Sequence, residues 1–263
     1  MRQFIAARGG GRLGRCRCLR YLHRLGFVHK RLKKRLLQAD EPRRAACVEE
    51  YAALLAEAEA SGAKICFAAE AHFRADGDVR GKWVRKGHPA LVESTSPRRG
   101  EQVRYYSAVC LETGEVAYRE LADTSSSATS AAFLGQLRAN QAGPLIVIWD
   151  NGPAHGGDAV RAYLATPDNA LRTVRLPAYS PDFNADEAIW GWARDEVTAN
   201  ACLGTGAKVQ EKMTHFLDGL KGRTTEVQSR CWTKLQALAG TPKPRVIATI
   251  AEGTHVGFSC ASV

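Results

Sequence analysis

Two acid-bearing segments, set a fixed distance apart in the chain, constrain the fold of this protein more than any other feature of its sequence. The first is the apolar run Leu145–Trp149, which is followed directly by Asp150. Four of the five residues in the run are β-branched or aromatic, and Gly152-Pro153 follows, so the run predicts a buried strand that stops at a turn. A carboxylate at the carboxyl end of such a strand lies at the edge of an α/β sheet where ligands usually bind.

The second segment is the loop 176–187, which contains two prolines and leads into Ala188-Ile189-Trp190. Asn184 is predicted to cap the N-terminus of a helix, and Glu187 then falls at the third helical position, where the helix dipole favours a negative charge. With 36 residues between the two acids, Asp150 is expected to end a strand and Glu187 to open a helix.

These motifs resemble those of the DDE transposases of the mariner-like superfamily, in the bacterial insertion-sequence branch. That family has an apolar strand ending in Asp-Asn, a His shortly after it, and a later Pro-x-Tyr-Ser-Pro-x-x-Asn-x-x-Glu segment. This chain has Asp150-Asn151, His155 and residues 177–187 at those places, with Ala185 where the family usually has Pro. The resemblance implies an α/β fold of the ribonuclease-H-like kind, with a mixed five-stranded sheet flanked by helices and a short, helical, basic N-terminal arm.

The first catalytic acid of the family is missing from this sequence. In the family it lies on a strand with the pattern apolar-Asp-Glu-x-x-Phe, and the matching strand is predicted at residues 63–73, where Ala69 takes the place of the Asp. Glu70 is expected on the opposite face, because side chains alternate along a strand, and Asp76 and Asp78 lie beyond its end. We expect an impaired enzyme, and rescue by Glu70 or these aspartates is the weaker alternative.

The resemblance implies that Asp150 and Glu187 are the two remaining catalytic residues and ligands of Mg²⁺ or Mn²⁺. The family's two-metal site would then be compromised by the alanine, since one carboxylate is normally shared between the ions. Asn151, His155 and Asn184 are secondary candidates. Asn151 and His155 either orient a water molecule or the scissile phosphate, or stabilise the turn and the helix that follow.

The positive charge of the chain is concentrated in its first 44 residues, which have a net charge of +12, while the remainder has −2. This distribution is typical of a nucleic-acid contact, and the alternatives are a disordered basic leader or a translated start that is not native. A second basic run, 30–35, is suited to contacting phosphates. The predicted DNA-binding residues are Arg17, Arg20, Arg24, Lys30, Arg31, Lys33, Lys34 and Arg35.

Three regions are predicted along the chain. Residues 1–44 form a basic arm with a helix between Cys16 and Gly26 that resembles the last helix of the family's helix-turn-helix region, followed by a linker; relative to the family this region looks truncated. Residues 45–240 form the catalytic domain, with helices at 128–140, 158–164 and 184–200, two more within 208–239, and a β-hairpin from 103 to 121. Asp40-Glu41-Pro42 is predicted to open a further helix that runs through 45–60. Residues 241–263 are a tail without an assigned role.

Several classes of protein are excluded or disfavoured. The sequence has no apolar stretch long enough for a membrane span and no signal-peptide core, which predicts a soluble, cytoplasmic protein. Its eight cysteines show no zinc-binding spacing and are expected to be reduced. No Gly-rich phosphate loop follows residues 145–149, which excludes a nucleotide-binding domain of that type.

The resemblance therefore implies a DNA transposase that cleaves phosphodiester bonds and transfers strands at insertion-sequence ends. Its expected partners are double-stranded DNA, as terminal inverted repeats and target DNA, and a second copy of the chain. Two alternatives remain: a non-catalytic DNA-binding relic of a transposase, and an unrelated ribonuclease-H-like nuclease that acts on RNA or hybrids.

Overall fold

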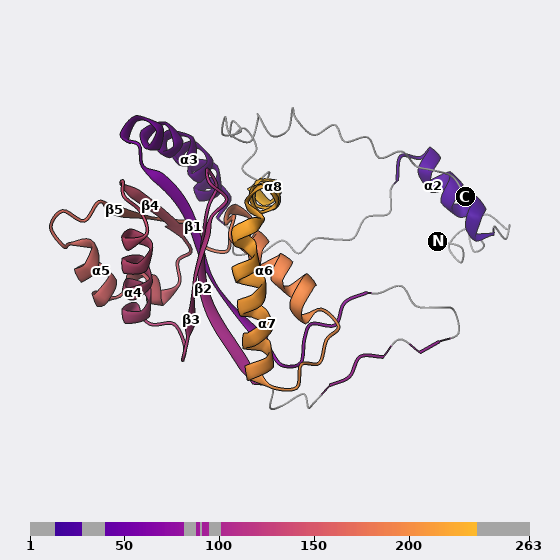
Figure 1. Ribbon diagram of the computed structural model, residues 1–263. Helices are drawn as coiled ribbons and strands as arrows, with labels where there is room; N and C mark the ends of the chain where they lie inside the picture. Colours follow the sequence, from indigo (N-terminus) through magenta and orange to yellow (C-terminus); the bar gives the residue numbers. More distant parts are fainter. Residues whose placement is uncertain (1–13, 28–39, 82–87, 90, 95–100, 236–263) are drawn as a thin grey trace. The chain divides into compact units, whose positions relative to one another are not determined.

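The computed structural model describes residues 14–27, 40–81, 88–89, 91–94 and 101–235. The chain divides into two compact units, Met1–Leu37 and Gln38–Val263. The described part of the first unit contains helix α2 (Arg15–Arg24), which confirms the helix expected before Gly26 (Figure 1). Gly26 has a φ of 78°, and the N–H of Phe27 bonds to the carbonyl oxygen of Leu22, which is the left-handed glycine cap that commonly ends a helix. The predicted DNA contacts at 30–35 and the tail 241–263 lie outside the described residues.

A mixed five-stranded sheet forms the centre of the second unit, in the order β3-β2-β1-β4-β5. Its strands are β1 (Lys64–Arg74), β2 (Gln102–Cys110), β3 (Val116–Leu121), β4 (Leu145–Trp149) and β5 (Leu171–Arg175). β2 pairs antiparallel with β1 and β3, whereas β4 is parallel to both β1 and β5. The predicted five-stranded sheet is confirmed, and β1 and β4 lie within one residue of the predicted 63–73 and 145–149.

The unequal lengths of β1 and β4 shape one edge of the sheet. All five residues of β4 are buried, as expected for a parallel strand with helices on both faces. Its pairing with β1 ends at Phe67 and Ile148, yet β1 continues to Arg74. From Ala68 onward, one edge of β1 therefore has no β4 partner and is open to other segments of the chain.

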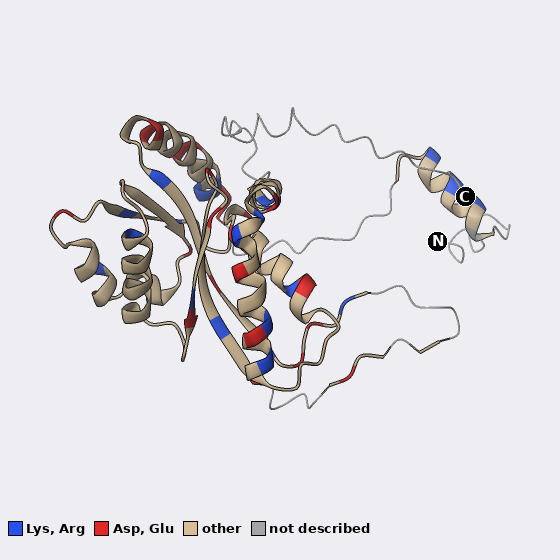
Figure 2. Ribbon diagram, in the orientation of Figure 1, with Lys and Arg blue, Asp and Glu red and all other residues tan. Residues whose placement is uncertain are grey.

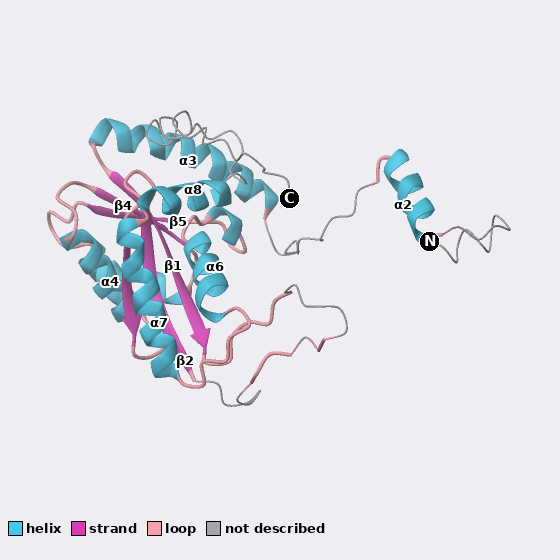
Figure 3. Ribbon diagram, turned by 45° about the vertical axis from the view of Figure 1, so that its right-hand side comes forward, coloured by secondary structure: helices cyan, strands magenta, loops and turns pink. Residues whose placement is uncertain are grey.

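Helices cover both faces of the sheet (Figure 3). On one face, α4 (Ser127–Ala139) and α5 (Asp158–Leu164) contribute Phe133, Leu134 and Val160 to a core shared with β4. The opposite face is covered by α3 (Glu41–Ser61), α6 (Glu187–Ala193), α7 (Gly206–Gly219) and α8 (Thr224–Leu235). None of the helices in the described part of the chain is both long and apolar enough to cross a lipid bilayer.

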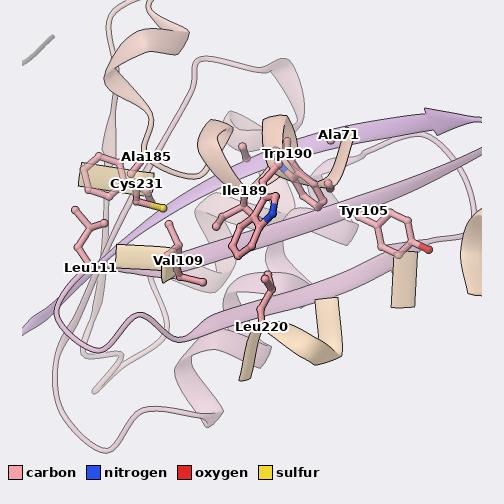
Figure 4. Close-up of a cluster of buried hydrophobic side chains, with 14 of the residues drawn as sticks. Ala71, Tyr105, Val109, Leu111, Ala185, Ile189, Trp190, Leu220 and Cys231 are labelled. Atoms are coloured by element: carbon pink, nitrogen blue, oxygen red, sulfur yellow. The ribbon is translucent and has the colours of Figure 1, made fainter. Parts of the chain in front are cut away.

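The larger core lies under α6, where Trp190 is fully buried among side chains of the sheet and of the C-terminal helices (Figure 4). Its ring lies 5.7 Å from the ring of Phe73 on β1 and 6.4 Å from that of Tyr105 on β2. Burying a tryptophan against two strands fixes the position of the short helix α6, because close-packed aromatic rings leave little room for displacement.

Helix α3 begins at the segment Asp40-Glu41-Pro42 that was predicted to open it. The carboxylate of Asp40 accepts a hydrogen bond from the N–H of Arg43, and Pro42 lies in the first turn, so the helix starts at Glu41. Arg43 and Arg44, which the sequence analysis placed in the basic arm, thus lie in the first turn of a helix of the second unit.

The predicted helix at 184–200 is wrong in two respects. Helix α6 starts at Glu187 with Asp186 as its N-cap, and after Ala193 the chain continues as a π-helix, Arg194–Thr198. Asn184 has the extended backbone of a capping residue, and its Oδ1 accepts the N–H of Asp186, but the α-helix starts only at Glu187. Its Nδ2 donates to the carbonyl oxygen of Ala68 on β1. Glu187 is therefore the first helical residue and not the third.

Candidate active site

The register of the sheet brings position 69 level with Asp150. The last pair of the β1–β4 ladder is Phe67 with Ile148, and two further residues along each chain lead to Ala69 and Asp150. Paired residues on parallel strands point to the same face of a sheet. Phe67, Ile148 and Ala69 all belong to the core under α6, so the Asp150 side chain leaves β4 on the face that α6 covers.

Asp150 and Glu187 line the same cavity, which has a volume of about 320 Å³. Asn151 and Asn184 line it too, together with the loop from Leu176 to Pro181. Burial raises the pKa of the Glu187 carboxyl, and the nearby charge of Asp150 raises it further, while Lys234 and Arg194 oppose this effect. The two predicted acids are thus close enough for their charges to interact.

His155 holds the Asp150 carboxylate in place. Its Nδ1 lies 2.8 Å from Asp150 Oδ1, and the N–H of Gly152 donates to the same oxygen at 2.8 Å. The hydrogen bond from His155 is the main reason that the pKa of Asp150 is lowered, and the Gly152 N–H adds to it. His155 is only 4% exposed and stacks on Trp149 with 4.3 Å between ring centroids, whereas the Asp150 side chain is 63% exposed.

The two asparagines anchor the loop that lines the cavity. Asn151 Nδ2 donates to the carbonyl oxygen of Leu176 at 2.9 Å, at the start of the loop. At its far end, Asn184 Nδ2 donates to the carbonyl oxygen of Ala68 at 2.9 Å, on the edge of β1 that β4 leaves open. Both side chains therefore make hydrogen bonds that fix the cavity wall.

A different carboxyl group lies near Ala69. Ala69 is 4% exposed and pairs with Ser107 of β2, whose hydroxyl donates a hydrogen bond to Asp186 Oδ2. Asp186 is fully buried, and its Oδ1 has no hydrogen-bond partner among the described residues. Burial raises the pKa of the Asp186 carboxyl well above its usual value. It does not line the cavity.

None of the three other acids considered in the sequence analysis lies at the cavity. Glu70 is exposed on the face of β1 opposite to Ala69, as the alternation predicts. Asp76 contacts Ser94, and Asp78 lies near Arg194. Both follow the end of β1, whose five residues past position 69 span roughly 17 Å.

The acids at the cavity fit one divalent cation, because hard cations prefer carboxylate oxygens and Asp150 and Glu187 face the same space. They do not fit the two-ion arrangement, since the position of a third carboxylate is Ala69. In the described part of the chain, no group of three or more His, Cys, Asp and Glu side chains is arranged to hold a metal ion.

Two residues that were not among the predicted site residues, Arg44 and Tyr179, shape the cavity loop. Arg44 of α3 donates from Nη1 to the hydroxyl of Ser180 at 2.7 Å, and its guanidinium contacts both carboxylate oxygens of Asp182, at 3.1 and 2.6 Å. Tyr179 lines the cavity with a left-handed backbone, φ 56°, and a 53% exposed side chain. The contact of Arg44 links residues more than 130 positions apart and has no local sequence signal.

In the first unit, helix α2 presents basic side chains without neighbouring acids (Figure 2). Arg17, Arg20 and Arg24 are all exposed, and their spacing of three and four residues places them along one side of the helix. The other predicted DNA contacts, at 30–35, lie outside the described residues.

Comparisons with known proteins identify the family of the chain and its fold. Residues 64–209, more than half of the chain, match the family model of the DDE superfamily endonuclease. No curated protein matches the chain at a significant level.

Solved structures extend the comparison. A Mos1 transposase paired-end complex with left transposon end is 17% identical with a TM-score of 0.62, covering 87% of this chain and 71% of that one. The mariner Mos1 paired end complex with Mg is 16% identical with a TM-score of 0.62, covering 92% and 75%. A Mos1 mariner paired end complex with Mn is 17% identical with a TM-score of 0.61, covering 87% and 72%. These matches establish the ribonuclease-H-like fold.

Proposed function

Because the chain belongs to the family of DDE superfamily endonucleases, we propose that it is a DNA transposase with an impaired active site. Its reaction is cleavage of phosphodiester bonds at the ends of an insertion sequence, followed by strand transfer. The observation that carries the proposal is that Asp150 and Glu187 line one cavity, with position 69 level with Asp150 on the same face of the sheet.

The chemistry follows from the placement of these groups. Asp150 and Glu187 would together hold Mg²⁺ or Mn²⁺, which supplies positive charge to the phosphate and activates the attacking hydroxyl. His155 keeps the Asp150 carboxylate ionised and aimed, and the two asparagines hold the wall against which the substrate lies. Ala69 offers no oxygen. Since metal-centred charge stabilisation contributes several kcal/mol, we expect activity to be lower by about 10³-fold or more.

The proposed partner is double-stranded DNA, both the terminal inverted repeats and the target. The basic side of α2 and the residues 30–35 would contact phosphates, and such contacts release counterions. One of the Mos1 structures described above is a paired-end complex with a left transposon end, and the other two are paired end complexes with Mg or Mn, which supports DNA and a divalent cation as partners. A homodimer on DNA is part of the proposal, because two ends must be brought together.

A second candidate function is favoured by Ala69 itself. A chain that keeps the fold and the basic arm but lacks one acid can still bind DNA without cleaving it, as a non-catalytic relic of a transposase. An unrelated nuclease that cleaves RNA or RNA–DNA hybrids is a weaker alternative. Cleavage rates measured on DNA, RNA and hybrid substrates would distinguish it from a DNA transposase.

The test restores the acid. The Ala69→Asp variant should nick DNA carrying the ends of its insertion sequence when Mg²⁺ or Mn²⁺ is present, and the parent chain should not. The double variant Ala69→Asp/Glu187→Gln is the matched control, since it has the restored acid without the second one. If the single variant binds these ends but cleaves no better than the double variant, the relic is the correct function.

A further inference from the structure

We infer that Tyr179 stacks on a nucleobase of the DNA that lies in the candidate site. The inference rests on the proposed function and adds to it a specific contact between protein and substrate. It starts from a backbone conformation that a tyrosine rarely adopts, in a loop that lines the cavity.

Tyr179 has a φ of 56°, in the left-handed region. The other two described residues with positive φ, apart from glycines, are Asp168 and Asn200, whose short polar side chains tolerate this conformation. A bulky aromatic residue is unfavourable there and persists only when its surroundings impose it.

The surroundings do impose it, because the loop is held on both sides of the tyrosine. On one side, Asn151 binds the carbonyl oxygen of Leu176. On the other, Arg44 binds Ser180, the next residue, and also Asp182 through two hydrogen bonds. A loop fixed within one residue of Tyr179 cannot relax without losing these contacts.

The ring that this backbone orients is not used for packing. Its side chain is 53% exposed, and among the described residues of the second unit no other Phe, Tyr or Trp has an exposed side chain. It lies on the wall of the cavity that contains Asp150 and Glu187. An exposed aromatic residue therefore lines the same cavity as the two acids that would hold the metal ion at the phosphodiester.

A nucleobase is the ligand that fits such a ring. DNA bound with a scissile phosphate at the acids has bases within a few ångströms of that phosphate. Stacking of a base on an aromatic side chain tolerates any sequence, because every base has a π-face. The neutral ring also places no further charge beside the acids, so it can contact a strand without repelling it.

The experiment separates the ring from the backbone that carries it. In Tyr179→Phe the ring remains, while Tyr179→Asn and Tyr179→Gly keep a left-handed backbone without a ring. The matched control is Asp168→Gly, a change at another exposed position of positive φ. The full chain is mixed with Mn²⁺ and fluorescein-labelled duplexes of its insertion-sequence ends, with 2-aminopurine placed in turn at each nucleotide around the cleavage point.

Anisotropy reports binding, and 2-aminopurine fluorescence reports stacking. We expect quenching at one position for the parent, for Tyr179→Phe and for Asp168→Gly. The Asn and Gly variants should lose this quenching and bind about tenfold more weakly. Unchanged quenching in these two variants, with DNA still bound, overturns the inference and leaves the proposed function intact. If neither the parent nor any variant binds the ends, both the stacking of Tyr179 and the proposed function are overturned.

Discussion

The side-chain amide of Asn184 donates a hydrogen bond to the carbonyl oxygen of Ala68, 116 residues earlier in the chain. This carbonyl lies just past the last β1–β4 pair, where β1 has lost its parallel neighbour. The bond attaches the loop before Glu187 to the strand that carries Ala69. The two ends of the candidate site are therefore held together by a contact that does not depend on any acid.

The first prediction concerns metal binding. Ala69→Asp should bind Mn²⁺ measurably more tightly than the parent, because a third carboxylate would join Asp150 and Glu187 at the cavity. Isothermal titration calorimetry measures this directly. Ala69→Asn is the control of the same size without the charge, and equal affinity of the Asp and Asn variants would contradict the prediction.

The second prediction concerns Asp186 and pH. Burial raises its pKa in the folded protein above the value of about 4 that it has in the unfolded chain. Its contribution to stability is therefore complete below that pH and is lost as the pH rises toward the folded pKa. Asp186→Asn removes this loss. The stability of the variant relative to the parent should therefore increase as the pH rises above about 4.

Urea unfolding at several pH values tests this prediction. Ser107→Ala is the companion variant, because it removes the hydrogen bond to Asp186 without changing the carboxyl group. A stability difference between Asp186→Asn and the parent that does not vary with pH would be inconsistent with a raised pKa of Asp186.

The third prediction concerns Arg44. Arg44→Ala should lower the free energy of unfolding by about 2 kcal/mol, since charge-assisted hydrogen bonds to Ser180 and Asp182 are lost and the guanidinium also packs on Phe183, 4.1 Å from the ring centroid. Arg43→Ala, one residue earlier and more exposed, should have little effect. A double-mutant cycle with Asp182→Asn should give a coupling energy; additive effects would show that the ion pair contributes nothing.

The fourth prediction concerns strain at Tyr179. Tyr179→Asn should stabilise the fold by about 0.5–1 kcal/mol, because Asn adopts positive φ more readily than Tyr. Tyr179→Gly should gain less, since glycine also increases the entropy of the unfolded chain. Unfolding in urea measures both. Destabilisation by Asn would mean that the exposed ring has a packing role after all.

The fifth prediction concerns the basic run at 30–35. Replacing its five basic residues by Gln should reduce the slope of log Kd against log salt by roughly 4, because each neutralised phosphate contributes about 0.9. Binding to DNA at several salt concentrations measures the slope. The five replaced residues are Lys30, Arg31, Lys33, Lys34 and Arg35. A slope unchanged by these substitutions would remove the run from the proposed interface.

Local patterns predicted the sheet well. The run Leu145–Trp149 is apolar on both faces, and the β2–β3 turn contains Gly114, whose φ of 71° a glycine favours. The start of α6 was predicted less well. Asn184 is a common capping residue, but its side chain bonds to Ala68, and a partner so distant in sequence leaves no local pattern. The same holds for Arg44 with Asp182 and for Ser107 with Asp186.

The small side chain at position 69 has a consequence for insertion sequences that are present in several copies. Ala69 packs into the apolar core with 4% of its surface exposed, so the strand loses nothing in folding by lacking an acid. A gene copy that has lost this carboxylate should still yield an intact protein able to occupy the same DNA ends as a working copy. We expect this inactive protein to compete with the active transposase for the DNA ends and so to lower the rate of transposition of the same insertion sequence.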